Sequence, residues 1–262
     1  MDSNKIVMLG TGHAVVEKCY NTCFVLQSKN ACLLVDGGGG SQILTQLKKV
    51  NLSLKEIDAL VVTHTHTDHL LGVIWILRMV SALKKQLIVY GHDEVINALK
   101  TICQLTFTTK MYEGLLEVCQ FVIVEDGQKE SVHDMQLTFF DIHSTKTKQF
   151  GFNVQINQLR IACLGDEPYQ VCCKPYVENC DLLMCEAFCL FSQKDIFKPY
   201  EKHHSTALDA GKLASQLNVK SLLLYHTEDK NLEQRKELYT KEASQYFNGT
   251  IYVPDDLETI LI

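Results

Sequence analysis

Positions 61 to 69 read Val-Val-Thr-His-Thr-His-Thr-Asp-His, and this stretch limits what the chain can fold into more than any other. A largely apolar run at 58–62 leads into it with the composition of a buried strand, and a second apolar run follows at 70–77. This order predicts a strand, a loop rich in polar ligands, and then a helix. Three imidazoles and one carboxylate at such close spacing are typical of metal ligands, so we expect a metal site here.

The spacing within the cluster predicts two cations. Alternate side chains of an extended segment point to the same side, so His64 and His66 can converge on one cation. Asp68 and His69 come one turn later and point elsewhere, which suits a second cation nearby. Imidazoles with few carboxylates favour zinc, and manganese or iron also suit mixed nitrogen and oxygen ligands.

Further ligands are needed, and three later segments share one design: an apolar run that predicts a strand and ends on a residue able to bind metal. Strand ends from several segments can converge at one edge of a sheet sandwich. The predicted ligand sets are His64, His66 and His143 for the first cation, Asp68, His69 and His226 for the second, and Asp166 as the bridge between them.

The rest of the chain alternates between predicted strands and helices, as in α/β proteins. Strands are expected at 5–12, 21–27, 31–36, 86–90, 116–124, 135–142, 150–156, 159–164, 182–185 and 221–225, and helices at 41–47, 72–82, 93–105, 205–217 and 231–247. Ser41 and Ser205 are expected to cap their helices. The glycine run 37–40 predicts a tight turn after a strand, because the Lys-Ser/Thr ending of a phosphate loop is missing. No linker or repeat interrupts the pattern, so we expect a single domain over 1–262.

Composition excludes several functional classes. The net charge of −6 and the pI near 5.9 argue against broad, non-specific nucleic-acid binding. No apolar run reaches the roughly 18 residues of a membrane span, and the N-terminal residues lack the pattern of a signal peptide. The 11 cysteines have no C-x-x-C spacing, and several lie in apolar strand-like segments, as at Cys32, Cys163 and Cys185. We therefore expect reduced thiols and a cytoplasmic protein.

With these residues in place, the chain resembles the metallo-β-lactamase fold hydrolases, and within them the ribonuclease Z branch. The residues at 64–69 are similar to the family signature, and 9–14, 181–187 and 204–207 are similar to the opening, D-L-L-x-x-E-A and H-S-T-A segments of that branch. The resemblance implies a four-layer αββα sandwich, a homodimer, and two divalent cations. Such cations lower the pKa of a bridging water, so that hydroxide is available to attack a phosphodiester at neutral pH.

The resemblance also implies catalytic roles. His204 is expected to be the general acid, because an imidazole titrates near the working pH, with Glu186 or Asp68 as the carboxylate that orients it. Asp36 is expected to orient a ligand imidazole or else to cap the turn that follows it. Outside this set, His13 is a candidate for lining the pocket, and Lys146 and Lys148 either meet a phosphate or form a solvated face.

The substrate class is open at this level. Ribonuclease Z enzymes that mature transfer RNA typically carry a long clamping arm between the ligands matching His143 and Asp166, whereas here only the 22 residues 144–165 separate them. With the acidic pI, that argues against transfer RNA and for a small or single-stranded phosphodiester, such as a cyclic nucleotide. The alternative is an ester, thioester or lactone hydrolase with the same cations. Electron transfer at a di-iron centre is a third class of function, but relatives of that class carry Glu where this chain has His66, which argues against it.

Overall fold

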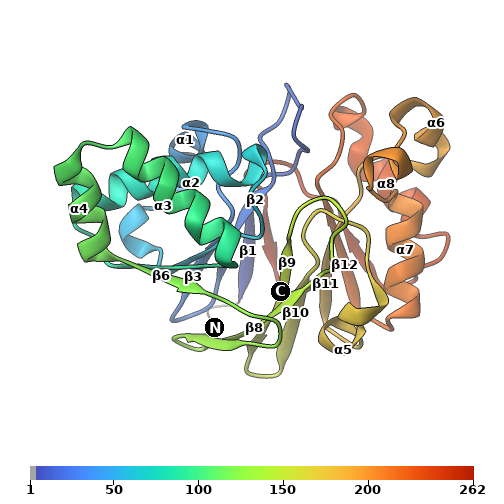
Figure 1. Ribbon diagram of the computed structural model, residues 1–262. Helices are drawn as coiled ribbons and strands as arrows, with labels where there is room; N and C mark the ends of the chain where they lie inside the picture. Colours follow the sequence, from blue (N-terminus) through green and yellow to red (C-terminus); the bar gives the residue numbers. More distant parts are fainter. Residues whose placement is uncertain (1–3) are drawn as a thin grey trace.

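Within residues 4–262, which the computed structural model describes, the strands form two seven-stranded sheets that face each other (Figure 1). In spatial order the first sheet holds β14 (Thr259–Leu261), β1 (Lys5–Gly10), β2 (Cys23–Gln27), β3 (Cys32–Val35), β4 (Ala59–Val61), β5 (Leu87–Gly91) and β6 (Cys119–Ile123). The second holds β13 (Thr250–Tyr252), β12 (Ser221–Tyr225), β11 (Leu182–Glu186), β10 (Leu159–Cys163), β9 (Phe150–Ile156), β8 (Met135–Asp141) and β7 (Lys129–Val132).

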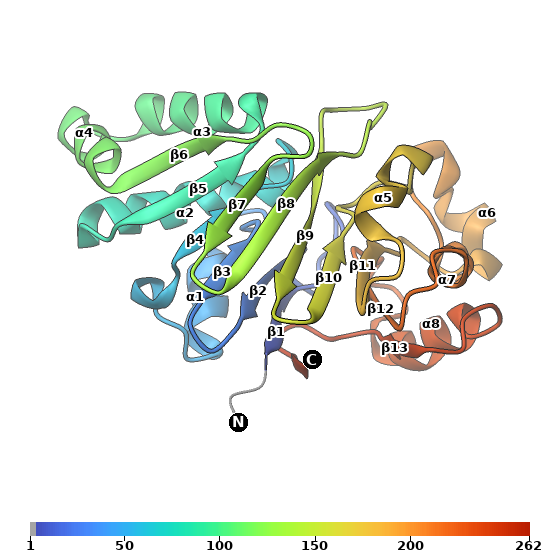
Figure 2. The same cartoon turned by 90° about the horizontal axis from the view of Figure 1, so that it is seen from below.

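Helices cover the outer side of each sheet, as Figures 1 and 2 show. The first sheet carries α1 (Gln42–Lys49), α2 (Thr67–Leu83), α3 (Asp93–Thr106) and α4 (Thr109–Val118). On the side of the second sheet lie α5 (Lys174–Val177), α6 (Lys194–Phe197), α7 (Ala207–Gln216) and α8 (Arg235–Ala243). Short 3₁₀ turns complete the chain at Leu54–Glu56, Val171–Cys173, Phe191–Gln193, Tyr200–Lys202 and Leu232–Gln234. The four-layer αββα sandwich expected from the sequence is confirmed.

Alternation along the strands builds the layers. In β1, Ile6 and Met8 are buried in the core between the two sheets, whereas Val7 and Leu9 are buried in the core beneath α1 and α2. Successive side chains of a strand point to opposite faces, so an unbroken apolar strand supplies both cores at once. A third core lies between the second sheet and helices α7 and α8. The central strands are therefore held from both sides.

The strand directions place a site at one rim of the sandwich. Strands β3 to β6 run parallel in the first sheet, and β10 to β13 run parallel in the second. In open sheets of this kind, ligands bind beyond the carboxyl ends of the strands. Polar residues follow within three positions of those ends: Asp36 after β3, His64 after β4, Asp166 after β10 and His226 after β12.

The glycine run 37–40 lets helix α2 dock against the end of β3. A Cβ atom on Gly72 would lie 1.8 Å from the Gly37 carbonyl oxygen, so only glycine fits there. The Gly37 amide donates to the His69 carbonyl at 2.9 Å, and the Gly72 amide donates to the Gly38 carbonyl at 2.8 Å. The run is a turn, as predicted, and it brings the residue that precedes it, Asp36, to the first turn of α2.

Several predicted boundaries were wrong. Helix α2 begins at Thr67, five residues before the predicted start, because His66 adopts the extended conformation of an N-cap. Residues 116–118 end helix α4, whose inner face is Leu115 and Val118, so the predicted strand begins only at Cys119. Ser41 is the N-cap of α1 but makes no side-chain capping bond.

At α7 the cap is Thr206, not Ser205. Its hydroxyl accepts a hydrogen bond from the Asp209 amide, and the Asp209 carboxylate accepts one from the Thr206 amide, which forms a capping box. Ser205 instead donates to Glu186 from both its amide and its hydroxyl. Ser205 therefore contacts the end of β11 and lies outside the helix.

The sequence also predicts that no segment spans a membrane and that the cysteines are reduced. None of the helices within residues 4–262 is both long and apolar enough to cross a membrane. All 11 cysteines are free thiols, and Cys32, Cys163 and Cys185 are buried as predicted. The prediction about an N-terminal leader concerns residues 1–3 in part, and these lie outside the described residues.

Candidate metal centre

Five of the predicted ligands gather at the rim in two overlapping groups. His64, His69 and Asp166 form one group, and Asp68, His69 and His226 form the other; within each, the ligand atoms lie within 4.8 Å of one another. His64 follows β4, Asp68 and His69 lie in the first turn of α2, and Asp166 and His226 follow β10 and β12. Both sheets therefore contribute to the same cluster.

Asp166 lies at the centre of the cluster. Its Oδ2 atom is 3.5 Å from His64 Nε2, 3.4 Å from His69 Nε2 and 3.4 Å from His226 Nε2. Burial by itself raises the pKa of Asp166, but the surrounding imidazoles lower it well below its usual range. One ionised oxygen therefore faces three imidazole nitrogens at the centre of the cluster.

The far nitrogen of each clustered imidazole contacts the protein. His69 Nδ1 lies 2.8 Å from Asp36 Oδ2, which turns Nε2 toward the cluster. His226 Nδ1 lies 3.2 Å from the Thr22 hydroxyl, which itself donates to the Gly12 carbonyl. His64 Nδ1 lies 3.0 Å from the Thr63 hydroxyl, which donates to Asp36. Such contacts at the rear fix the ring orientation of metal ligands.

Burial keeps two of the imidazoles neutral. It holds the pKa of His64 well below its ordinary value and, against the opposing charge of Asp166, lowers the pKa of His226 to about 3. For His69, burial lowers the pKa, but the carboxylates of Asp68 and Asp36 raise it well above its ordinary value. Neutral imidazole is the form that binds metal, and the carboxylates around His69 favour any positive charge placed at Nε2.

The donor set fits a divalent cation. His64 Nε2, His69 Nε2 and Asp68 Oδ2 are buried and have no hydrogen-bond partner in the protein. Each buried polar atom without a partner costs about 1–3 kcal/mol, and a cation bound between them removes that cost. Nitrogen and carboxylate donors in this proportion suit zinc, with manganese and iron as the next candidates.

The other two predicted ligands lie outside both groups. His66 is half-buried, and its ring centroid is 4.5 Å from that of His64, close enough for the two rings to face one space. His143 is exposed, has a φ of +53°, and donates from its amide to Asp141 Oδ1 at 2.7 Å. Their assignment to the first cation stays a prediction.

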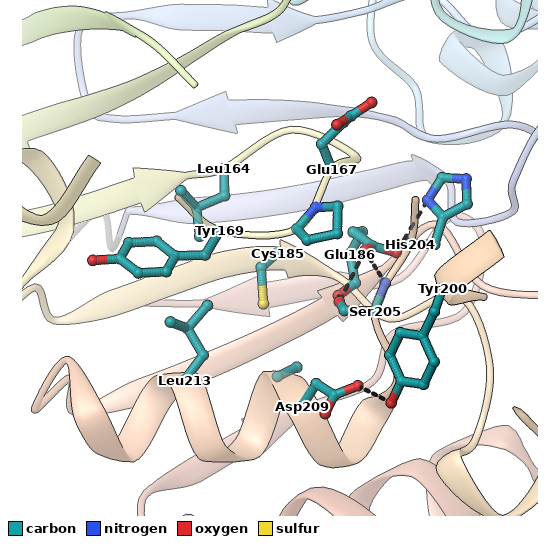
Figure 3. Close-up of a pocket in the computed structure, with 12 residues that line it drawn as sticks. Leu164, Glu167, Tyr169, Cys185, Glu186, Tyr200, His204, Ser205, Asp209 and Leu213 are labelled. Carbon is teal, nitrogen blue, oxygen red and sulfur yellow. Dashed lines mark hydrogen bonds and ion pairs between the residues drawn. The ribbon is translucent and has the colours of Figure 1, made fainter. Parts of the chain in front are cut away.

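A second pair of titratable groups lies beside the cluster. His204 Nδ1 is 3.5 Å from Glu186 Oε2 (Figure 3). The His204 ring centroid is 5.4 Å from that of His226. The ring stacks on Phe188 at 4.8 Å with an interplanar angle of 5°. Burial lowers the pKa of His204, but the Glu186 carboxylate beside Nδ1 outweighs it and raises that pKa above its ordinary value. His204 is thus held ready to carry a proton near neutral pH.

Several residues near the site were missed or left open in the sequence. Gln149 is buried, its amide nitrogen lies 2.9 Å from His64 Nδ1 and donates to Asp166 Oδ1, and no pattern in the sequence indicates this. No sequence pattern indicates the position of Phe188 against the His204 ring either. The two lysines are engaged elsewhere: Lys148 pairs with Asp93 at 2.6 Å, and Lys146 donates to a backbone carbonyl, that of Lys202. His13 lies half-buried beside Phe188, with ring centroids 4.6 Å apart.

Known proteins share this architecture. Residues 4–246 match the family model described as "Anti-Pycsar protein Apyc1". A ribonuclease Z from Azobacteroides pseudotrichonymphae genomovar. CFP2 is 24% identical over 280 aligned positions, covering 94% of this chain and 95% of that protein.

Solved structures agree on the fold. The metallo-beta-lactamase fold protein YhfI from Bacillus subtilis has a TM-score of 0.79 at 23% identity, covering 99% of both chains. Human tRNase Z, short form, has a TM-score of 0.78 at 22% identity and covers 98% of this chain and 99% of that one. The chain is a metal-dependent hydrolase of the metallo-β-lactamase fold, related to ribonuclease Z, and it belongs to the Anti-Pycsar protein Apyc1 family.

Proposed function

We propose that this protein is a dinuclear-metal phosphodiesterase of the ribonuclease Z type that acts on a small, nucleotide-like phosphodiester. The observation that carries the proposal is the His204–Glu186 pair beside the metal centre. The ring centroid of His204 lies 5.4 Å from that of His226, one of the clustered ligands. An acid beside a metal centre suits a reaction in which a poor leaving oxygen must be protonated, as in phosphodiester cleavage.

The cations would be held by the clustered residues His64, Asp68, His69, Asp166 and His226, with His66 and His143 completing the first set. Two bound divalent cations, zinc in our proposal, supply Lewis acidity toward the phosphoryl oxygens and an activated water as nucleophile. Gln149, Thr22 and Asp36 hold the ligands in place through the contacts described above. This arrangement removes the need for the ligands to reorganise during the reaction.

His204 supplies the proton. Because Nδ1 faces Glu186, Nε2 is the ring nitrogen from which a proton can pass to the leaving oxygen as the phosphorus–oxygen bond breaks. Glu186 is buried, and its other oxygen accepts from Ser205, so the carboxylate is oriented before substrate binds. Of the two orienting carboxylates expected from the sequence, Glu186 is the better supported, because Asp68 Oδ2 lies 3.4 Å from His69 Nε2.

The substrate class follows from what surrounds the site. Residues 144–165 contain a short loop and the hairpin of β9 and β10, which supports a small substrate rather than transfer RNA. Ester, thioester or lactone hydrolysis is the second candidate. It is favoured by one observation: Lys146 and Lys148 are both engaged in contacts within the protein, which leaves them poorly placed to meet a phosphate.

A substrate panel separates the two. Protein loaded with zinc or manganese should hydrolyse bis(p-nitrophenyl) phosphate and 3′,5′-cyclic nucleotides faster than p-nitrophenyl esters, thioesters and lactones. Turnover confined to the carbonyl substrates would replace the phosphodiesterase proposal with the second candidate.

Three wider proposals accompany this function. Residues 1–262 act as one domain, since the clustered ligands come from both sheets.

The chain forms a homodimer through α2, where Trp75, Met79 and Leu83 are 43%, 36% and 43% exposed at a spacing of four residues. The protein works in the cytoplasm, where its free thiols would stay reduced. Sedimentation of Trp75→Glu against the unmodified protein tests the dimer.

A further inference from the structure

Arg235 is the bulkiest fully buried side chain among residues 4–262, and it opens helix α8 on the side of the second sheet. Its guanidinium makes four hydrogen bonds. Nη1 donates to the hydroxyls of Thr11 and Thr227, each at 2.9 Å. Nη2 donates to the Pro254 carbonyl at 2.6 Å and to Asp255 Oδ1 at 3.1 Å. One buried cation therefore holds three separate segments of the chain.

These three segments belong to both sheets. Thr11 directly follows β1 of the first sheet, and Thr227 lies two residues past β12 of the second. The segment 253–258, which contains the other two acceptors, crosses from β13 in the second sheet to β14 in the first (Figure 2). A guanidinium is a planar fork of fixed geometry, so a single side chain sets the spacing of all three segments. Arg235 thus connects the two sheets at this rim.

The connection lies directly behind a clustered ligand, His226. Thr227 follows His226 in the chain, and its amide donates to the Thr11 carbonyl at 3.0 Å. Residue 12, next to Thr11, accepts at its carbonyl from the Thr22 hydroxyl, which lies 3.2 Å from His226 Nδ1. Both the backbone and the ring of this ligand are therefore supported by segments that the guanidinium holds.

His226 needs such support because its backbone conformation is unfavourable. Its φ is +58°, in the left-handed region that few residues other than glycine adopt. Conformations of this kind persist only where the surrounding contacts hold them. The two residues grouped with it, Asp68 and His69, lie in the first turn of α2 on the side of the first sheet. The distance from His226 to these two residues thus depends on how the sheets are connected at this rim.

The contacts of Arg235 are not those that stability alone would select. Only one of its four acceptors is a carboxylate, and the side chain of that residue, Asp255, is 52% exposed. The Nε atom is buried and has no hydrogen-bond partner. Burying a cation in this way is unfavourable unless it is fully paired. The arrangement is explained by the position that the guanidinium imposes on the segments around it.

We infer that Arg235 is a positioning residue of the metal centre: it holds the end of β12 against the end of β1 and so keeps His226 in place. The cation that Asp68, His69 and His226 would hold then depends on a side chain that contacts none of them. The inference goes beyond the proposed function, because it needs a bound cation but no particular substrate.

The test compares Arg235→Met, which removes all four contacts, with Arg235→Lys, which keeps the charge but loses the planar fork. Thr227→Val removes a single hydroxyl and keeps the inference testable if Arg235→Met does not fold. Arg160→Met is the matched control, because Arg160 donates to three backbone carbonyls at 175–178 and lies at the far end of β10 from Asp166. Thermal melting of each variant checks that it folds.

Metal binding is measured by competition for zinc against a chelator and by the visible absorption of cobalt-loaded protein, which reports ligand geometry. We expect Arg235→Met to bind zinc roughly tenfold more weakly or worse, as when other supporting contacts of metal ligands are removed, and to change the cobalt spectrum. Arg235→Lys and Thr227→Val should show smaller losses in the same direction. Arg160→Met should melt at a lower temperature but keep the zinc affinity and the cobalt spectrum of the unmodified protein.

A folded Arg235→Met with unchanged zinc affinity and an unchanged cobalt spectrum overturns the inference. So does an equal loss of affinity in Arg160→Met, because metal binding would then follow overall stability, and so does an unmodified protein that binds neither metal. If Arg235→Met does not fold, unchanged binding by Thr227→Val overturns it. Weaker zinc binding in the variants, together with no phosphodiester turnover by the zinc-loaded unmodified protein, contradicts the proposed function and supports the role of Arg235.

Discussion

Replacing Asp36 by Asn should weaken metal binding while leaving the fold in place. Asp36 lies at a φ of +55°, a conformation that Asn tolerates better than most residues, so the backbone can keep its path. The carboxylate accepts three hydrogen bonds of 2.8 Å each, from the Thr63 amide, the Thr63 hydroxyl and His69 Nδ1. An amide has one acceptor oxygen, so in either orientation its NH₂ group faces at least one of these donors.

The magnitude follows from the lost contacts. A hydrogen bond to a charged group is worth about 1.5–3 kcal/mol, which corresponds to roughly a 10- to 150-fold change in an equilibrium constant. Where His69 Nδ1 loses its acceptor, the ring no longer has a fixed tautomer, and the affinity of the cation at Nε2 falls accordingly. Measured effects of removing such supporting contacts in metal sites are of similar size, about 10- to 100-fold.

The assay is competition for zinc against a chelator of known affinity, with thermal melting of both proteins. Asp58→Asn is the matched control, because Asp58 also accepts a backbone hydrogen bond, from the Cys32 amide at 2.9 Å, but lies away from the cluster. Zinc affinity of Asp36→Asn within twofold of the unmodified protein would refute the reasoning. So would an equal loss in Asp58→Asn.

Four further predictions follow, two on pH, one on packing and one on metal removal. Because Glu186 raises the pKa of His204, Glu186→Gln should move the alkaline limb of the kcat profile to lower pH; an unmoved limb contradicts the pairing. Because the pKa of His204 is raised in the folded protein, its protonation adds to the free energy of unfolding; this contribution is complete below about pH 6.5 and is lost as pH rises through the folded pKa. Curves of stability against pH for Glu186→Gln should lack this loss. Gly72→Ala should cost several kcal/mol or prevent folding because of its clash with Gly37, whereas Gly40→Ala, which meets no atom within 4 Å, should melt normally. Chelation should lower the melting temperature, and equal melting with and without EDTA would count against a cation in the cluster.

Much of the fold was predictable because local pattern and burial agree. Strands such as β1 and β12 are continuous apolar runs, and buried strands read that way whatever their partners are. The positions of ligands at strand ends were also predictable, because a polar residue after such a run has to lie at a sheet edge. His64, Asp166 and His226 follow this rule.

Other features depend on partners that are far away in the sequence. The start of α2 was missed because its first turn is polar and gives no helical periodicity, and its position depends on docking against Gly37. The short strands β7, β13 and β14 exist through pairing with neighbours rather than through their own residues. Thr22 lies 204 positions from the imidazole it supports, His226, so no local pattern reports the contact.

The most direct test of the account is the turnover of bis(p-nitrophenyl) phosphate by His204→Ala and by the unmodified protein, with bound metal counted in both. The account predicts two cations per chain in each protein and a kcat that falls by about a hundredfold or more in the variant. Equal turnover in the two proteins, or no turnover by unmodified protein that holds both cations, would contradict it.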